Sequence, residues 1–280
     1  MLTTFALVAL LSLQDPPVAQ EPPAAEAAAP AVPAAPTETS ESVRAYLVEA
    51  ESHLYDPQAA GLSSLEFDMP IELPAPVGAV GSAHVTWTSE SGADISLTQN
   101  EGGAPGVPPA MVDGYGRQMS MQLLGYMLNK PITSMLEGGV AAMDGVEDGL
   151  VKVRFHIPMA LEQGVQEQAL YFDDAGMLQR MRTIAQVEGP MGQMKVEQSQ
   201  SFAWKPASEG SELMVADQQT TVADMGIMKV TASTSFGYTT VSDIVLTTSA
   251  STTSDVPMQG KVTQVIAATN LRVNGQPAGG

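Results

Sequence analysis

The chain has 280 residues, of which 12 are basic and 31 acidic, so its formal net charge at pH 7 is −19. A surface this acidic is repelled by phosphate backbones and anionic lipid headgroups, which argues against binding to nucleic acid and against charge-driven docking on membranes. Cysteine is absent, so no disulfide bond can stabilise the fold, and stability has to come from an apolar core.

The first 40 residues differ in composition from the rest. Residues 2–13 are almost all apolar, and residues 14–36 are dominated by alanine and proline. The apolar stretch is shorter than the roughly 20 residues that a membrane-spanning helix needs, and its length suits a signal-peptide core. We therefore predict a signal peptide at residues 1–20 and a disordered Ala/Pro-rich tether at residues 21–40. An apolar, disordered N-terminus on a cytoplasmic protein is the alternative, because no Lys or Arg precedes Arg44.

A helix and a strand follow the tether. Apolar residues recur at helical spacing from residue 43 to residue 54, and Ser40 or Ser42 can cap the start of this helix. From residue 65 to residue 73, apolar residues alternate with polar ones, which is the pattern of a half-buried strand. Because Pro70 cannot donate a backbone hydrogen bond, we expect an edge position or a bulge there.

The next part of the chain predicts more strand, then a second helix. Alternation continues over residues 83–97, and a Gly/Pro loop over residues 102–109 interrupts it. A helical region follows at residues 113–136, which Pro131 should kink or divide. Residues 138–149 are predicted to be loop.

From residue 150 onward the chain is nearly all strand. The segment Asp173–Gly176 is a good hairpin turn between two of the predicted strands. Strands recur about every 12 to 20 residues without a repeat of fixed period, which favours an antiparallel meander. The predicted strands are residues 151–157, 169–172, 178–187, 194–204, 213–222, 227–238, 244–248 and 262–273.

Together these elements predict a β-rich α+β fold. We expect one large curved antiparallel sheet, a half-barrel, whose concave face is covered by the two helical segments. It forms a single domain at residues 41–275, with a disordered tail at residues 276–280.

Three segments resemble one known family. Residues 46–67 resemble an amphipathic helix that leads into a first strand, residues 170–181 (LYFDDAGMLQRM) a hairpin with an acidic turn, and residues 268–275 (ATNLRVNG) a closing strand. This order resembles the bacterial outer-membrane lipoprotein carrier (LolA/LolB-type) family, which implies a half-barrel with helices over an apolar cavity. The chain departs from that pattern because the hairpin lacks a proline after its turn and 14 of residues 231–254 are Ser or Thr.

Methionine gives an independent indication of chemistry. The chain has 17 methionines, 14 of them between Met111 and Met228, and methionine adapts well to irregular apolar ligands. Ordinary core filling explains the same composition. If a cavity is present, we expect an apolar binding site lined by Phe67, Met69, Trp87, Met119, Leu123, Met127, Phe155 and Phe172.

Signatures of catalysis and metal binding are missing from the sequence. The three histidines, His53, His84 and His156, are far apart in sequence and no pair has ligand spacing. No G-x-S-x-G elbow, phosphate-binding loop or complete G-x-G-x-x-G motif occurs. We therefore predict no catalytic residues, no metal site, no cofactor and no enzyme activity.

Two functional hypotheses remain. The first is an exported protein of the bacterial periplasm or cell envelope that shields an apolar lipid or an acylated polypeptide in the half-barrel, as a lipid or lipoprotein carrier does. It would have no stable transmembrane anchor. The second is a structural or interaction protein of the cell envelope that pairs with other chains through exposed β edges and has no small-molecule ligand.

Overall fold

The computed structural model describes residues 38–73, 77–100, 107–158, 164–189, 192–226, 228–257 and 260–278. The predicted signal peptide and all but the last three residues of the predicted tether lie outside the described residues. No helix in the described part of the chain is both long enough and apolar enough to cross a membrane.

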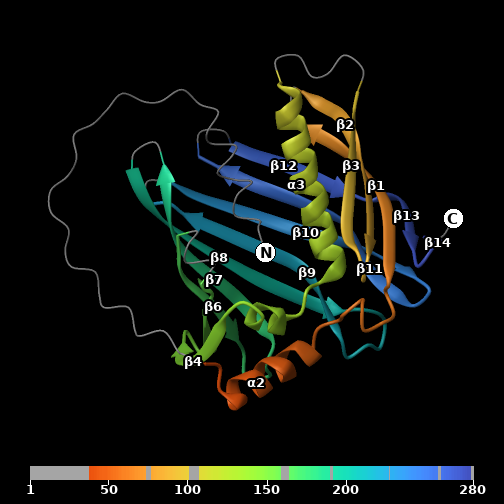
Figure 1. Ribbon diagram of the computed structural model, residues 1–280. Helices are drawn as coiled ribbons and strands as arrows, with labels where there is room; N and C mark the ends of the chain where they lie inside the picture. The colour runs from red at the N-terminus through yellow and green to blue at the C-terminus, as the bar shows by residue number, and fades with distance from the viewer. Residues whose placement is uncertain are drawn as a thin grey trace.

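In its described residues the fold is β-rich and antiparallel with two α-helices, as the sequence predicts, but its strands are divided between two sheets (Figure 1). The smaller sheet has five strands in the order β14-β13-β1-β2-β3. Its strands are β1 (Ser64–Leu73), β2 (Gly78–Thr88), β3 (Gly92–Gln99), β13 (Thr269–Val273) and β14 (Gln276–Pro277). The two ends of the folded chain therefore meet, because β13 pairs with β1. Gln276 and Pro277, which we expected in a frayed tail, pair with β13.

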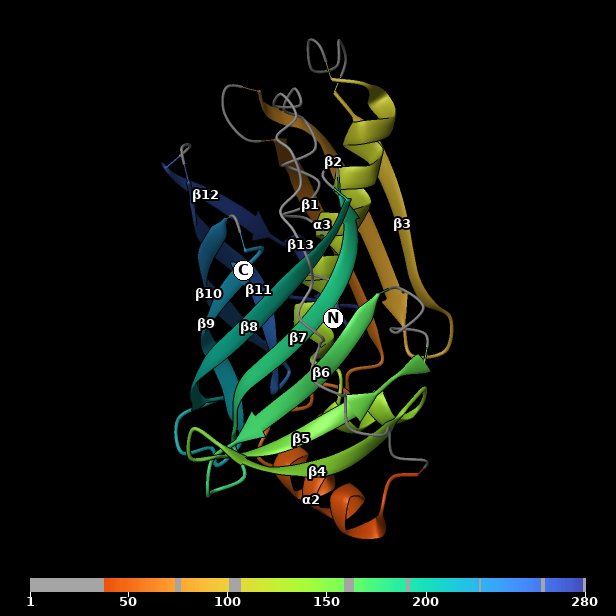
Figure 2. The same cartoon turned by 90° about the vertical axis from the view of Figure 1, so that its left-hand side faces the viewer.

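The larger sheet is a nine-stranded antiparallel meander in which every strand pairs with its neighbour in sequence. Figure 2 shows the strand direction turning steadily from β4 to β10, as expected for a strongly twisted sheet. Its strands are β4 (Val140–Glu147), β5 (Leu150–His156), β6 (Val165–Phe172), β7 (Leu178–Gly189), β8 (Gly192–Pro206), β9 (Met214–Asp224), β10 (Lys229–Val241), β11 (Ile244–Val256) and β12 (Gly260–Ala267).

Strand β4 corrects one expectation, because residues 138–149 were predicted to be loop. Glycines and acidic residues hide the strand pattern in this segment, and a bulge between Met143 and Val146 interrupts its pairing with β5. Two acidic residues of the segment, Asp144 and Glu147, form ion pairs with Lys152 of β5. Pairing with the next strand thus supplies the order that local sequence does not indicate.

The helices begin and end where local chemistry places them. Helix α2 (Glu41–Ser52) starts at Ser40, whose side chain accepts a hydrogen bond from the Val43 amide. Helix α3 (Pro109–Leu128) stops at Asn129, which adopts the left-handed conformation with φ of 41°. A short 3-10 helix, η1 (Ile132–Leu136), follows Pro131, so proline divides the predicted helical region as expected.

Each helix organises an apolar cluster of its own. In the α3 cluster, α3 lies between the small sheet and the β10–β12 end of the large sheet. In the α2 cluster, α2 and η1 pack on β4, β5, β6 and the start of β7. The core is therefore split into two main parts at opposite ends of the nine-stranded sheet.

Candidate functional site

Cross-strand register shows that one face of the nine-stranded sheet carries both helices. Residues directly opposite one another on paired strands point to the same side of a sheet. One such row crosses all nine strands, and its members Val153, Leu170 and Met181 belong to the α2 cluster. The row consists of Met143, Val153, Leu170, Met181, Gln200, Thr221, Ala232, Ser254 and Val262. We call this side of the sheet the inner face.

Two neighbouring rows lie on the same face. One consists of Ala141, Phe155, Gln168, Thr183, Gln198, Ala223 and Val230. The other consists of Phe202, Gln219, Thr234, Thr252 and Gln264, and its last member contacts α3. None of the residues in these three rows is charged, although the chain carries 43 Asp, Glu, Lys and Arg residues in total.

The centre of the inner face is polar. Amide and hydroxyl side chains predominate there, between the apolar clusters at its two ends. We call this group the polar band, and its members are Gln168, Thr183, Gln198, Gln200, Gln219, Thr221, Thr234, Thr252, Ser254 and Gln264.

Hydrogen bonds satisfy part of the polar band. The hydroxyls of Thr234 and Thr252 lie 2.9 Å apart, and Gln219 donates to the Thr221 hydroxyl over 3.2 Å. The side-chain oxygen of Gln198 is buried and has no hydrogen-bond partner in the part of the chain that the structure describes. An unpaired buried acceptor is costly, so this oxygen has the capacity to bind a donor from a ligand.

At the α3 end, Gln264 connects the polar band to the helix. Its amide donates to the Tyr115 hydroxyl and, over 2.9 Å, to the sulfur of Met119. Burial raises the pKa of Tyr115 above its ordinary value, against the opposing effect of the hydrogen bond from Gln264. The phenol is therefore neutral at physiological pH and offers a hydroxyl rather than a charge.

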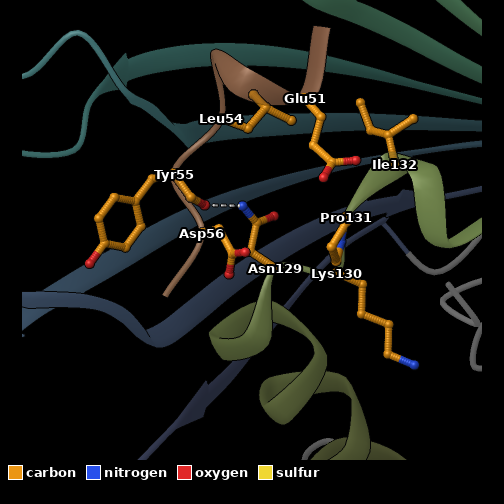
Figure 3. A pocket seen from close by; sticks show the side chains of 8 residues that line it. All are labelled: Glu51, Leu54, Tyr55, Asp56, Asn129, Lys130, Pro131 and Ile132. Carbon is orange, nitrogen blue, oxygen red and sulfur yellow. Dashed lines mark hydrogen bonds between the residues drawn. The ribbon is translucent and has the colours of Figure 1, made fainter. Parts of the chain in front are cut away.

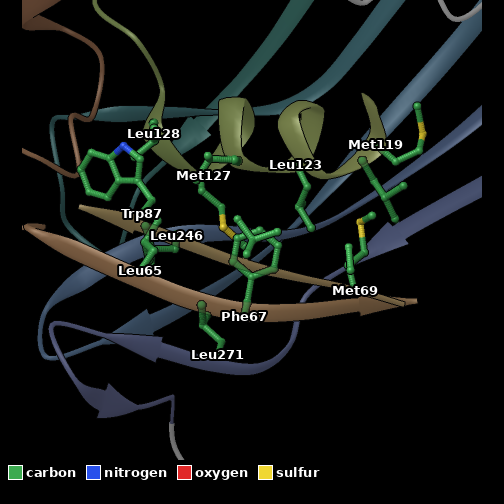
Figure 4. Close-up of a cluster of buried hydrophobic side chains, with 14 of the residues drawn as sticks. Leu65, Phe67, Met69, Trp87, Met119, Leu123, Met127, Leu128, Leu246 and Leu271 are labelled. Atoms are coloured by element: carbon green, nitrogen blue, oxygen red, sulfur yellow. The ribbon is translucent and has the colours of Figure 1, made fainter. Parts of the chain in front are cut away.

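The predicted site residues divide between the two clusters. Six of them belong to the α3 cluster, where α3 packs on β1 and β2 (Figure 4): Phe67, Met69, Trp87, Met119, Leu123 and Met127. The other two, Phe155 and Phe172, belong to the α2 cluster. All eight are buried, and their role as ligand contacts stays a prediction.

Sequence reasoning did not single out the polar band. The available signal was the Ser/Thr-rich stretch at residues 231–254, which we noted only as a departure from an apolar cavity wall. The glutamines of β8 and β9 give no such signal by themselves, because only the register aligns them across strands.

A small hollow lies where the two helical regions meet (Figure 3). Its cavity volume is about 20 Å³, and it is lined by Glu51, Leu54, Tyr55, Asp56, Asn129, Lys130, Pro131 and Ile132. The Asn129 amide donates to the Tyr55 carbonyl over 2.6 Å, and Glu51 accepts hydrogen bonds from the amide and hydroxyl of Thr133. Small-molecule pockets occupy about 300–1,000 Å³, so these contacts are best described as a joint that fixes α2 against η1.

The opposite face of β4–β8 carries a dense charge cluster. Lys152 lies 3.2–3.3 Å from carboxylates of Asp144, Glu147 and Glu167, and Arg180 lies over the ring of Tyr171 at 4.1 Å. Burial alone would lower the pKa of Lys152, but Glu167 and the other acidic groups outweigh it and raise that pKa. Opposite charges are paired within this cluster, which stabilises the pairing of β4 to β8.

A second polar group lies on the exposed side of the small sheet. His84 Nδ1 lies 2.8 Å from Asp68, which also accepts a 2.8 Å hydrogen bond from Asn270. The hydrogen bond from Asn270 and, to a smaller extent, the contact with His84 lower the pKa of Asp68. Ser96 is the cross-strand neighbour of His84, so the residue types of a hydrolase triad are aligned. Both His84 and Asp68 are more than a third exposed on an open sheet face. We infer a structural role for them, in which Asp68 links β1 to Asn270 of β13.

Metal binding has no support in the described ranges, where no group of three or more His, Asp or Glu side chains is arranged to hold an ion. Neither a scan of protein-family models nor a search of curated proteins returns a match to this chain.

Proposed function

We propose that this protein binds a lipid or another ligand with an acyl chain, outside the cytoplasm, on the inner face of its nine-stranded sheet. The observation that carries the proposal is the placement of both helices on one face whose three central rows contain no charge. The central glutamines of this face, Gln198, Gln200 and Gln219, are only 5%, 6% and 7% exposed. An uncharged site shielded from water between two apolar clusters favours ligands that water solvates poorly.

Half-buried apolar side chains supply the contact area for such a ligand. Met181, Phe202 and Trp204 border the polar band on the α2 side, and Phe236 borders it on the α3 side. Each buried methylene contributes about 0.8 kcal/mol, so one long acyl chain gives a useful affinity. Transport of the bound ligand, as the resemblance to lipoprotein carriers implies, is part of this proposal.

The test is native mass spectrometry of the full chain, expressed in a bacterium and purified from the envelope fraction, followed by organic extraction. A co-purifying lipid at close to one per chain would support the proposal. An empty monomer would contradict it. The same spectra test export, because cleavage between residues 12 and 20 removes a defined mass from the chain.

A second candidate function is pairing with other chains through sheet edges. It is favoured by β4, an outermost strand of the large sheet, on which Met143 is 45% and Val146 is 70% exposed. Exposed apolar residues on an edge strand promote strand addition. A ladder of oligomers without lipid in the same spectra would favour this function over lipid binding.

A further inference from the structure

The polar band raises the question of what an acyl-chain binder does with amides and hydroxyls on its inner face. An acyl chain makes no hydrogen bonds, so it cannot satisfy the buried side-chain oxygen of Gln198, which has no partner among the described residues. Burying polar groups without partners costs free energy. The polar band therefore fits the headgroup of an amphiphile better than its tail.

The charge distribution selects among headgroups. The three inner-face rows hold no cation to neutralise a phosphate and no carboxylate to pair with an amine. The chain's charges include a cluster on the opposite face, where Lys152 and Arg180 already pair with acidic residues. A buried phosphate without a counter-charge is strongly disfavoured, so phospholipids fit this face poorly.

Amide and hydroxyl side chains instead match hydroxyl groups. A glutamine amide both donates and accepts, as does a hydroxyl, so a ring of hydroxyls finds partners of either kind along the band. Gln200 lies opposite Thr221 and Gln219 lies opposite Phe202, so the two glutamines are diagonal neighbours on paired strands. Diagonal neighbours are about 7–8 Å apart, which long side chains such as glutamine can span to bond hydroxyls of one sugar ring. The Gln198 oxygen, which has no hydrogen-bond partner among the described residues, provides an acceptor for one such hydroxyl.

Aromatic rings border the polar band on the α2 side. Phe202 precedes Gln219 in its inner-face row, and its ring stacks on that of Trp204 with centroids 5.5 Å apart. Both rings are half-buried, and their apolar faces offer a surface for the C–H side of a sugar or for the start of an acyl chain.

We propose that the ligand is a neutral glycolipid, with its uncharged sugar headgroup hydrogen-bonded to Gln198, Gln200 and Gln219 and its acyl part against the apolar clusters. This inference rests on the proposed lipid-binding function and names the ligand class of the same site. It commits to a membrane-derived glycolipid rather than to a free saccharide, because the apolar clusters border both ends of the band.

The test compares four probes that differ in one part each. The delipidated full chain is titrated with a monoglucosyl diacylglycerol, with phosphatidylglycerol and diacylglycerol of the same acyl chains, and with glucose alone. We expect the glycolipid to bind at least about tenfold more tightly than either lipid that lacks the sugar, since a few hydrogen bonds separate them. Glucose alone should bind far more weakly than the glycolipid.

Matched variants locate the sugar. Gln219→Leu removes an inner-face amide, whereas Gln218→Leu changes the neighbouring residue, which is exposed and points to the opposite face. We expect Gln219→Leu and Gln198→Leu to reduce glycolipid affinity about tenfold and to leave diacylglycerol affinity unchanged. Gln218→Leu should alter neither. Circular dichroism confirms that each variant is folded.

The outcomes separate this inference from the proposed function. Equal binding of glycolipid, diacylglycerol and phosphatidylglycerol would retain lipid binding and overturn the sugar assignment. Unchanged glycolipid affinity in Gln198→Leu and Gln219→Leu would also overturn it. Glucose binding as tightly as the glycolipid would identify a saccharide site instead, and failure of every probe to bind would overturn the lipid-binding function itself.

Discussion

The packing of α3 leads to a prediction that separates a filled core from a ligand cavity. Met127 and Met121 lie on the same helix, but Met127 is 0% exposed in the α3 cluster and Met121 is 52% exposed. Replacing either with alanine makes the same chemical change and nearly the same change in helix propensity. The difference between the two variants therefore measures the packing around Met127.

We expect Met127→Ala to lower the free energy of unfolding by about 2–5 kcal/mol, the range for large-to-small changes in packed cores. The side chain lies close to Phe67 in the cluster (Figure 4), and few of its contacts can be regained after truncation. For a domain of this size, the corresponding fall in melting temperature is about 4–20 °C. Met121→Ala should stay within about 0.5 kcal/mol of the parent chain.

The assay is urea denaturation of the delipidated protein, followed by circular dichroism and by tryptophan fluorescence. Trp87 belongs to the same cluster as Met127, whereas Trp204 packs against the α2 cluster, so the emission reports on both parts of the core. A cost below about 1 kcal/mol for Met127→Ala, with an unchanged m-value, would refute the packing argument. Met127 would then border unfilled space, as a cavity-lining residue does.

Three further predictions concern other parts of the fold. Gly125→Ala should stabilise the protein by about 0.5–1 kcal/mol, because an added methyl there meets nothing within 4 Å. Gly116→Ala places a methyl 2.6 Å from Ile71, so this variant should be about 1–3 kcal/mol less stable than Gly125→Ala. Equal melting temperatures of the two variants would contradict this prediction. Lys152→Met should lower the free energy of unfolding by about 1–3 kcal/mol, because it leaves three carboxylates without their shared cation. Lys205→Met breaks the exposed ion pair with Asp217 and should lower it by at most about 1 kcal/mol. A larger loss in the Lys205 variant would show that the charge cluster is not what stabilises β4–β8. Burial raises the pKa of Tyr238 from 10.0 to about 12, so the contribution of the neutral phenol to stability is complete below pH 10 and is lost as pH rises through 12. Across this pH range, the free energy of unfolding should fall more steeply for the parent chain than for Tyr238→Phe. Parallel curves for the two proteins would count against the raised pKa.

Local sequence determined the elements of this protein to a large extent. Alternation of apolar and polar residues located most strands, and the Asp173–Gly176 turn was correctly placed because Asp173 accepts hydrogen bonds from the backbone of its own turn. Ser40 and Pro131 set the boundaries of helices through capping and through the missing amide of proline. These effects act over a few residues, so one sequence suffices to predict them.

Expectations about cellular location and ligand rest on composition and length and not on local structural effects. Composition and length alone predict the signal peptide and the tether, and the acidic balance bears on partners, but each of these remains a prediction. Residues such as Phe67 and Met127 were correctly recognised as apolar and inward-facing. Whether an apolar side chain faces a ligand or another side chain is not encoded in its spacing.

Only the tertiary structure decided how the strands are grouped and which side chains meet. The split into two sheets depends on Leu65 pairing with Val273, a contact between opposite ends of the folded chain. The polar band exists because Gln200 and Thr221 are brought into register across β8 and β9. Alternation fixes only which residues of one strand share a face, whereas register between strands depends on hydrogen bonds and packing over long separations. A shift of a single residue in the pairing would turn the side chains of the band to the other face, so the register of the assembled sheet determines which face is polar.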